Sequence, residues 1–270
     1  MSDPLQLGFI GAGRMAQAMI KGLVERGIVP APQIACTSAA DGTGEAAAER
    51  FGIDFLPDPA AVAARADILV LAIKPQQLAQ LPPELAEATA GKLIVSILAG
   101  TPLARLAERF PEARNLIRAM PNTPGMIGQG VTAYAARRGL SPLDRERAEA
   151  ILGALGRLLA VEEAQLDAVT GVSGSGPAYL FEFVAALRDG GIAAGLDPEV
   201  AYILALETAR GASELLHEVP ETPEQHRDWV SSPGGTTLAG LAVMEQRGFR
   251  ATLRETVLAA TARSRELAQS

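Results

Sequence analysis

The chain has 270 residues, of which 48% are hydrophobic and 20% are charged, and its formal net charge is −7. This is an ordinary globular balance, with enough apolar material for one large domain or two modest ones. The acidic charge, without any basic stripe, argues against nucleic acid or an anionic membrane surface as a partner, because both are bound through clustered lysine and arginine.

The N-terminus shows no secretory signal, and no apolar run approaches the roughly 18 residues that a membrane span needs, so we expect a cytoplasmic protein. A single cysteine, Cys36, excludes an internal disulfide framework, and its apolar neighbours predict a buried thiol. The two histidines, His217 and His226, lie in polar surroundings and are predicted to be on the surface. Neither has a cysteine or acidic neighbour at metal-ligand spacing, so no metal site is expected.

The first predicted element is a short buried strand, residues 5–10, which enters a glycine-rich turn and then a helix ending near Arg26. The turn has the pattern G-x-G-x-x-A in the strand–turn–helix setting of a dinucleotide-binding site. Gly11 would allow the tight turn, Gly13 would let a pyrophosphate approach, and Ala16 would let the helix lie close to the strand. The alternative is a glycine-rich turn that serves only strand–helix packing.

A second strand at 33–36 is followed by the hydroxyl residues Thr37 and Ser38. An NAD-specific site usually has an acidic residue at this point, where it binds the ribose 2′-hydroxyl. None is present here, which favours NADPH while leaving NADH possible. Capping of the next helix is the alternative role of the two hydroxyls.

Strands and helices then alternate, which predicts an α/β fold with a doubly wound sheet. Further strands are expected at 53–56, 66–73, 92–98, 115–119, 131–136 and 157–161, with helices that include 44–50, 76–88 and 142–152. Ligands bind beyond the carboxyl ends of such strands, so the candidate site segments are 11–15, 72–74, 98–100 and 120–123. Lys74 could meet a phosphate or ribose there, or be a solvated surface lysine.

The alternation stops near residue 162, and the rest of the chain reads as helices at 178–194, 199–216, 238–246 and 250–268. We therefore expect a dinucleotide-binding domain at 1–162 and an all-helical domain at 163–270. The helices are apolar on more than one face, which favours dimerisation through this half. A self-contained bundle packed on the first domain is the alternative.

Five motifs occur in order along the chain: GAGRMA at 11–16, LAIKP at 71–75, MPNTP at 120–124, GVSGSGPAY at 171–179 and SSPGGTT at 231–237. Together they resemble the pyrroline-5-carboxylate reductase family over nearly all 270 residues. The resemblance implies an N-terminal Rossmann domain, a C-terminal helical dimerisation domain, and NADPH or NADH as hydride donor in the last step of proline synthesis. Dimers of this family commonly assemble into decamers.

The turn and the strand ends give a set of predicted cofactor-binding residues: Ile10, Gly11, Ala12, Gly13, Arg14, Met15, Thr37, Ser38, Ala72, Ile73, Lys74, Ala99 and Asn122. Of these, the resemblance places Ser38, Lys74 and Ala99 where the family meets its cofactor. It places Glu163, Thr236 and Thr237 where the family meets substrate or product. A solvated helix acid is the alternative for Glu163.

The substrate implied by this family is a cyclic imine with a ring carboxylate, to which hydride is added. Backbone N–H groups at 235–237, including that of Gly235, together with the Ser232 and Thr237 hydroxyls, would bind the carboxylate. Thr237 is the predicted catalytic residue, since its hydroxyl can polarise the imine nitrogen.

Two other functions remain open at this point. The first is a β-hydroxyacid dehydrogenase, which has the same two-part layout. The pattern of that enzyme class has a catalytic lysine in the helix after the crossover, whereas residues 173–187 of this chain contain no lysine. A non-catalytic dinucleotide-binding protein could keep the same fold.

Overall fold

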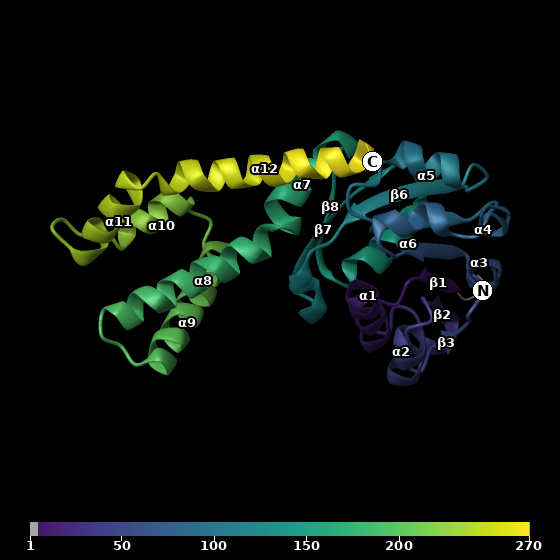
Figure 1. The fold of residues 1–270 in the computed structure, drawn as a ribbon, viewed down its shortest axis with the longest axis horizontal. Coiled ribbons are helices and arrows are strands. Elements are labelled where there is room, and N and C mark those ends of the chain that lie inside the picture. Colours follow the sequence, from purple (N-terminus) through teal and green to yellow (C-terminus); the bar gives the residue numbers. More distant parts are fainter. Residues whose placement is uncertain (1–4, 270) are drawn as a thin grey trace. The chain divides into compact units, whose positions relative to one another are not determined.

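The computed structural model describes residues 5–269, and its contacts divide the chain into two compact units. Unit 1 comprises Met1–Ser175 with Ala259–Ser270, and unit 2 comprises Gly176–Leu258 (Figure 1). Unit 1 continues past the predicted boundary at 162/163, because the short helices after that point pack with the sheet, and it takes in the end of the last helix. The domain boundary at 162/163, where the strand–helix alternation stops, stays a prediction.

Unit 1 contains an eight-stranded sheet in the order β3-β2-β1-β4-β5-β6-β7-β8. The strands are β1 Leu7–Ile10, β2 Ile34–Thr37, β3 Asp54–Phe55, β4 Ile68–Leu71, β5 Leu93–Ser96, β6 Asn115–Met120, β7 Gly130–Ala136 and β8 Gly156–Ala160. The strand order reverses between β1 and β4, as in a doubly wound fold, and a crevice for a ligand forms at such a switch point. The predicted fold class is confirmed.

The pair β6 and β7 is antiparallel, with Met120 opposite Ala133, whereas the other paired strands are parallel. The link between β6 and β7 contains only a 3₁₀ turn, η3 (Thr123–Ile127). A parallel neighbour needs a crossover of a dozen or more residues, so a link this short reverses the strand direction. The strand at 131–136 is predicted from the sequence, but its antiparallel direction is not.

Helices cover both faces of the sheet, and the buried side chains of the central strands alternate between two apolar cores, while Ala133 and Ala135 of β7 face a third, smaller core. The helices of unit 1 are α1 Arg14–Glu25, α2 Thr43–Phe51, α3 Pro59–Arg65, α4 Glu84–Ala88, α5 Leu103–Arg109, α6 Pro142–Gly153 and α7 Leu166–Val169. On β4, Ile68 and Val70 face the core that α1, α2 and α6 share. Leu69 and Leu71 face the core that α3, α4 and α5 share. Burial on both faces explains the continuous apolar run in the sequence.

The predicted helix at 76–88 is instead two short elements, the 3₁₀ turn η2 (Pro75–Gln80) and α4. Pro82 and Pro83 lie between them. Proline removes a backbone donor and keeps the residue before it out of the α conformation, so Leu81 is extended with ψ 140°. The prediction of one continuous helix was wrong for this reason.

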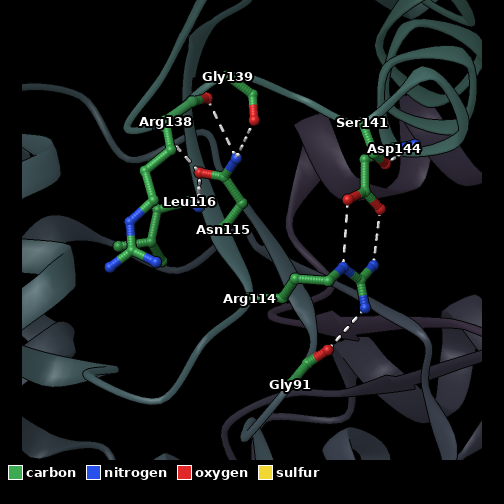
Figure 2. A network of polar contacts seen from close by, with 8 residues as sticks. All are labelled: Gly91, Arg114, Asn115, Leu116, Arg138, Gly139, Ser141 and Asp144. Atoms are coloured by element: carbon green, nitrogen blue, oxygen red, sulfur yellow. Dashed lines mark hydrogen bonds and ion pairs between the residues drawn. The ribbon is translucent and has the colours of Figure 1, made fainter.

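The start of β6 is fixed by a polar network (Figure 2). Asn115 Nδ2 donates to the Arg138 carbonyl at 3.1 Å, and its Oδ1 accepts from the Arg138 N–H at 3.2 Å. Arg114 donates to both carboxylate oxygens of Asp144, at 2.7 and 3.2 Å. This bidentate bond, together with the hydroxyl of Ser141, lowers the pKa of Asp144. The first turn of α6 is thereby joined to the sheet.

Unit 2 consists of helices, as predicted: α8 Gly176–Ala193, α9 Pro198–Glu218, α10 Pro223–Trp229, α11 Thr236–Gln246 and the first part of α12 Phe249–Gln269. Helices α8 and α9 lie side by side (green in Figure 1). Many large apolar side chains are exposed, including Phe181 at 66%, Ile203 at 52% and Leu258 at 60%. None of the helices described in 5–269 is long and apolar enough to cross a membrane.

Candidate active site

The turn between β1 and α1 has the geometry that its glycines predict. Gly11 has φ +105°, in the region that favours glycine, and its N–H donates to the Thr37 carbonyl at 2.9 Å. A Cβ at Gly11 would lie 2.5 Å from the Ala72 carbonyl oxygen. The turn therefore packs directly against the chain that follows β4.

The helix α1 begins with unpaired donors directed out of its first turn. Its first backbone hydrogen bond runs from the Gln17 N–H to the Gly13 carbonyl at 2.9 Å. The N–H groups of residues 14–16 precede that bond and remain available for an anion. Gly13 is exposed, and among the described residues no atom lies within 4 Å of the position its Cβ would occupy. This open backbone fits the pyrophosphate of a dinucleotide.

At the end of β2, the two predicted hydroxyl residues are already engaged. Thr37 is buried and its Oγ1 donates to the Pro57 carbonyl at 3.2 Å. Ser38 Oγ donates to the Ala39 carbonyl at 2.8 Å and accepts from the Gly44 N–H at 2.9 Å. The capping alternative is thus realised at Ser38, because this bond holds the first turn of α2. The role of these residues toward a cofactor stays a prediction.

A cavity of about 280 Å³ lies where several predicted strand-end segments meet. Its lining consists of Met15, Ala72, Ile73, Ile97, Met120, Pro121, Asn122, Thr123 and Gly174. Among the described residues, no ionisable side chain lines it, so the walls are apolar with a few neutral polar groups. Such a lining suits a flat, uncharged ring and leaves the chemistry to a bound cofactor.

Four predicted cofactor residues line this cavity: Met15, Ala72, Ile73 and Asn122. Asn122 Oδ1 accepts a hydrogen bond from the Val131 N–H at 2.9 Å, which fixes the start of β7. Lys74 and Ala99 lie outside the cavity lining. Lys74 is exposed, and its N–H donates to Gln77 Oε1 at 2.9 Å.

The cavity lining also contains residues outside the predicted set of cofactor-binding residues, although some of them lie within the candidate strand-end segments. Ile97 lies just before the candidate segment 98–100, and Met120 and Thr123 lie within the candidate segment 120–123. Gly174 belongs to the motif at 171–179, to which no role was assigned. Its place in that motif is the one sequence signal that could have marked Gly174 as a site residue. No local pattern shows that this residue reaches the ends of the strands.

In unit 2, the glycine-rich stretch forms a tight turn ahead of α11. The Gly235 N–H donates to the Ser232 carbonyl at 2.9 Å, and Gly234 has φ +71°. Proline followed by a glycine with positive φ is typical of a type II turn. The helix α11 begins at Thr236 with Gly235 as its N-cap, so the Thr236 and Thr237 N–H groups lie in its first turn. Thr236 and Ser232 are exposed.

Glu163 belongs to unit 1, whereas the other predicted substrate residues belong to unit 2. Glu163 Oε1 accepts a hydrogen bond from the Leu103 N–H at 2.6 Å and lies 3.7 Å from Arg118 Nη1. It therefore caps the start of α5. A role toward substrate stays a prediction.

The shifted pKa values lie away from the cavity. Burial raises the pKa of Cys36 to about 11, with Glu45 adding to the effect, so the predicted buried thiol is confirmed. His217 is exposed as predicted. The prediction for His226 was wrong: it is 8% exposed and packs edge-on against Trp229 at 4.8 Å between ring centroids. The residues flanking His226 are polar, so no local pattern indicates that helix α10 turns this side chain inward.

Within residues 5–269, no group of three or more His, Cys, Asp and Glu side chains is arranged to hold a metal ion. The groups described above are the backbone donors of the β1–α1 turn, the hydroxyls at the start of α11 and the apolar walls of the cavity. They suit a dinucleotide at the β1–α1 turn and a small anion at the start of α11.

Two family models match the chain. Residues 163–267 match the model described as pyrroline-5-carboxylate reductase dimerisation, and residues 6–100 match the model described as NADP oxidoreductase, coenzyme F420-dependent. The first match begins at the predicted domain boundary.

Full-length relatives and solved structures show the same similarity. A pyrroline-5-carboxylate reductase of Synechocystis is 43% identical, covering 97% of this chain and 98% of the relative, and that of Arabidopsis thaliana is 39% identical, covering 100% and 98%. The structure of a pyrroline-5-carboxylate reductase from Coxiella burnetii has a TM-score of 0.91 at 31% identity, covering 99% of this chain and 100% of that chain. A Plasmodium falciparum pyrroline carboxylate reductase with NADP bound has a TM-score of 0.87 at 27% identity, covering 98% of both chains.

Proposed function

Since the chain belongs to the pyrroline-5-carboxylate reductase family, we propose an assignment of its residues to the parts of that reaction. The protein is an NAD(P)H-dependent oxidoreductase of proline biosynthesis, for which we propose NADPH as the favoured hydride donor and NADH as a possible one. It reduces the C=N bond of 1-pyrroline-5-carboxylate and releases L-proline.

The observation that carries the assignment is the cavity between the carboxyl ends of β4 and β6. Its lining joins Met15 of α1, Ala72 after β4 and Met120 at the end of β6, so it lies beside the dinucleotide-binding turn. An apolar cavity in this position supports its assignment to the nicotinamide ring. When bound there, NADPH supplies the hydride.

The pyrophosphate is assigned to the turn at Gly11 and Gly13. The open backbone at Gly13 and the free N–H groups of the first turn of α1 support this assignment. Thr37 and Ser38 are assigned to the adenosine side, at the end of β2. Neither of these two positions carries a carboxylate that would repel a 2′-phosphate, and the acid that follows in the loop, Asp41, accepts hydrogen bonds from Thr43.

The substrate carboxylate is assigned to the turn before α11, where Ser232, Gly235, Thr236 and Thr237 lie together. Hydrogen bonds to a charged group contribute roughly 1.5–3 kcal/mol each, so two or three would hold a small acid without an arginine. The positive end of the α11 dipole favours the same charge.

The imine nitrogen is assigned to the Thr237 hydroxyl. Electron density moves to this nitrogen as hydride reaches the neighbouring carbon, so a hydrogen bond there stabilises the transition state more than the ground state. A threonine hydroxyl is a weak acid and therefore polarises the nitrogen rather than giving up its proton. Glu163, which accepts the hydrogen bond from the Leu103 N–H at the start of α5, is assigned to the substrate side, where its negative charge contributes to the local electrostatic field.

We also propose that the chain forms a homodimer through its helical part, and that dimers assemble into a decamer in the cytoplasm. The exposed apolar side chains of α8 and α9 support the dimer, because a surface this apolar favours association. Light scattering across a range of protein concentrations distinguishes a dimer from a decamer.

The proposed function is tested by the loss of NADPH absorbance when 1-pyrroline-5-carboxylate is added. The expected result is stoichiometric oxidation of NADPH with formation of proline. Oxidation of a β-hydroxyacid with NADP, and no reaction with the imine, would support the dehydrogenase alternative. The same assay with NADH gives the cofactor preference.

A further inference from the structure

A buried arginine lies behind the cavity and has no part in the reaction as assigned above. Arg118, on β6, is 5% exposed. Its Nη2 pairs with Asp167 Oδ1 at 2.8 Å, and its Nη1 lies 3.7 Å from Glu163 Oε1. Asp167 Oδ1 also accepts a hydrogen bond from Ser264 Oγ at 2.9 Å. These four residues, Arg118, Glu163, Asp167 and Ser264, are called the Arg118 network below.

We propose that Arg118 is a positioning residue, and that the Arg118 network fixes two chain segments that frame the nicotinamide side of the cofactor site. Arg118 acts from behind, through the segments themselves, and does not touch cofactor or substrate. The inference rests on the proposed function, because that function assigns the cavity to nicotinamide.

The first segment is the connection from α7 to α8. Asp167 is on α7, which continues directly into the π-helical turn η5 (Thr170–Gly174). Gly174 at its end lines the cavity, and a Cβ there would overlap the Met120 methyl group. Met120 is two residues along β6 from Arg118, so the two side chains leave the same face of the strand. The Arg118–Asp167 pair thus joins the cavity wall on β6 to the wall on η5.

The π-helical turn explains why such an anchor is needed. Within η5 the Ser175 N–H donates to the Thr170 carbonyl at 2.8 Å, a bond to the fifth residue back. This wider turn is uncommon, is found mostly as single turns, and is frequent at functional sites. Asp167, three residues before η5, provides a charged contact on the N-terminal side of this turn through its bonds to Arg118 and Ser264.

The second segment follows β5 and includes 98–100, a candidate cofactor segment. A Cβ at Gly100 would lie 3.1 Å from Leu267 Cβ and 3.3 Å from the Ser264 carbonyl oxygen, so the end of α12 packs on this segment. Further along, the Leu103 N–H donates to Glu163 Oε1 at 2.6 Å. The Arg118 network therefore reaches both ends of the segment, through Ser264 at one end and Glu163 at the other.

The chemistry of the network requires an arginine. A guanidinium group is planar and has several donors, so it can face two carboxylates at once. A lysine would place a single nitrogen on a flexible stem and would keep at most one of the two pairs well. Because Asp167 and Arg118 are both largely buried, removal of either charge leaves the other uncompensated, and conservative variants are the right probes.

The experiment uses the full-length protein and the variants Arg118→Lys, Asp167→Asn and Ser264→Ala. Hydrogen exchange measured without cofactor should become faster by roughly threefold or more at 166–175 and stay unchanged at 8–20. The Kd for 2′,5′-ADP, which lacks the nicotinamide, should stay within about twofold. The kcat with NADPH and 1-pyrroline-5-carboxylate should fall by about tenfold, because small misplacements of reacting groups are costly.

Two matched controls accompany these variants. Arg145→Lys alters an exposed ion pair with Glu149 on α6, and Thr256→Ala removes a hydroxyl that donates to the Thr252 carbonyl of its own helix α12 at 2.9 Å. Both should behave as the wild type. The inference is overturned if Arg118→Lys and Asp167→Asn keep wild-type hydrogen exchange at 166–175 and wild-type kcat. It is also overturned if these variants only lose thermal stability while kcat per folded molecule is unchanged. A wild type that does not oxidise NADPH with the imine refutes the proposed function, and the exchange rates then still decide whether the network holds 166–175.

Discussion

Gly11 and Ala72 are in backbone contact across the switch point of the sheet. A Cβ on Gly11 would lie 2.5 Å from the Ala72 carbonyl oxygen and 2.7 Å from its carbonyl carbon. Both atoms belong to the backbone, which cannot move aside as a flexible side chain can. Gly11, which forms the tight turn after β1, thus also allows the chain after β1 to pack closely against the chain after β4.

Gly11→Ala is expected to lower the free energy of unfolding by about 2–4 kcal/mol, since it adds backbone strain at φ +105° to a clash with the backbone. Thermal and urea unfolding without cofactor measure this loss. An unchanged unfolding free energy would mean that the Ala72 chain can shift at little cost.

Gly13→Ala is the matched comparison within the same turn. Gly13 has φ −69° and ψ 179°, and its Cβ would be free of contacts with the described residues, so the unfolding free energy should change by less than about 1 kcal/mol. The new methyl group would meet the pyrophosphate instead, and the Kd for NADPH should rise by about tenfold or more. Fluorescence titration with NADPH checks this, and an unaltered Kd would contradict the assignment of the turn.

Thr237→Ala is expected to lower kcat/KM for 1-pyrroline-5-carboxylate by one to two orders of magnitude, or about 1.5–3 kcal/mol, through loss of the hydrogen bond to the imine nitrogen. Steady-state kinetics at saturating NADPH measure the change. The control is Thr252→Ala, since the exposed Thr252 hydroxyl bonds to the Gly248 carbonyl at 3.2 Å. Equal kcat/KM in the wild type and Thr237→Ala would remove Thr237 from the mechanism.

Asp144→Asn is expected to destabilise the protein in a pH-dependent way. The bidentate bond from Arg114 lowers the folded-state pKa of Asp144 below its ordinary value of 3.8. A lowered pKa means that the ionised Asp144 stabilises the fold, and this contribution is present in full above the unfolded-state pKa of 3.8. It is lost as the pH falls through the folded-state pKa. At pH 7 the variant should lose about 1–3 kcal/mol.

Urea unfolding at several pH values between 7 and 3 tests this sign. The difference between wild type and Asp144→Asn should shrink as the pH falls below 3.8. Glu266→Gln is the control, because its pair with Arg263 is exposed on both sides and should contribute little. A difference that is constant across the whole pH range would show that charge is not the cause.

Cys36 is expected to resist thiol reagents in the folded protein. Burial raises its pKa to about 11, so almost no thiolate is present near pH 8, and the side chain is 0% exposed. Labelling with a disulfide reagent should be slow in buffer and rapid in guanidinium chloride. Rapid stoichiometric labelling of the native protein would contradict the buried position of this thiol.

The sequence alone determined most of the architecture, because its strongest signals are local. The turn at Gly11 and Gly13 follows a strand and precedes a helix, and this order fixes the start of a doubly wound sheet. The start of α9, predicted at 199, and the glycine-rich turn at 231–237 likewise depend on only a few neighbouring residues. Local hydrogen bonds and periodicity are readable without tertiary contacts.

Only the tertiary structure decided which side chains meet across the fold. The cavity joins Met15 to Gly174, and the Arg118 network joins β6 to Ser264, with no pattern in the sequence to show either contact. The direction of β7 and the inward turn of His226 were missed for the same reason. The periodicity of apolar residues identifies which face of an element is buried. Which residues contact that face depends on packing between segments that are far apart in the chain, and this packing is defined only in the folded structure.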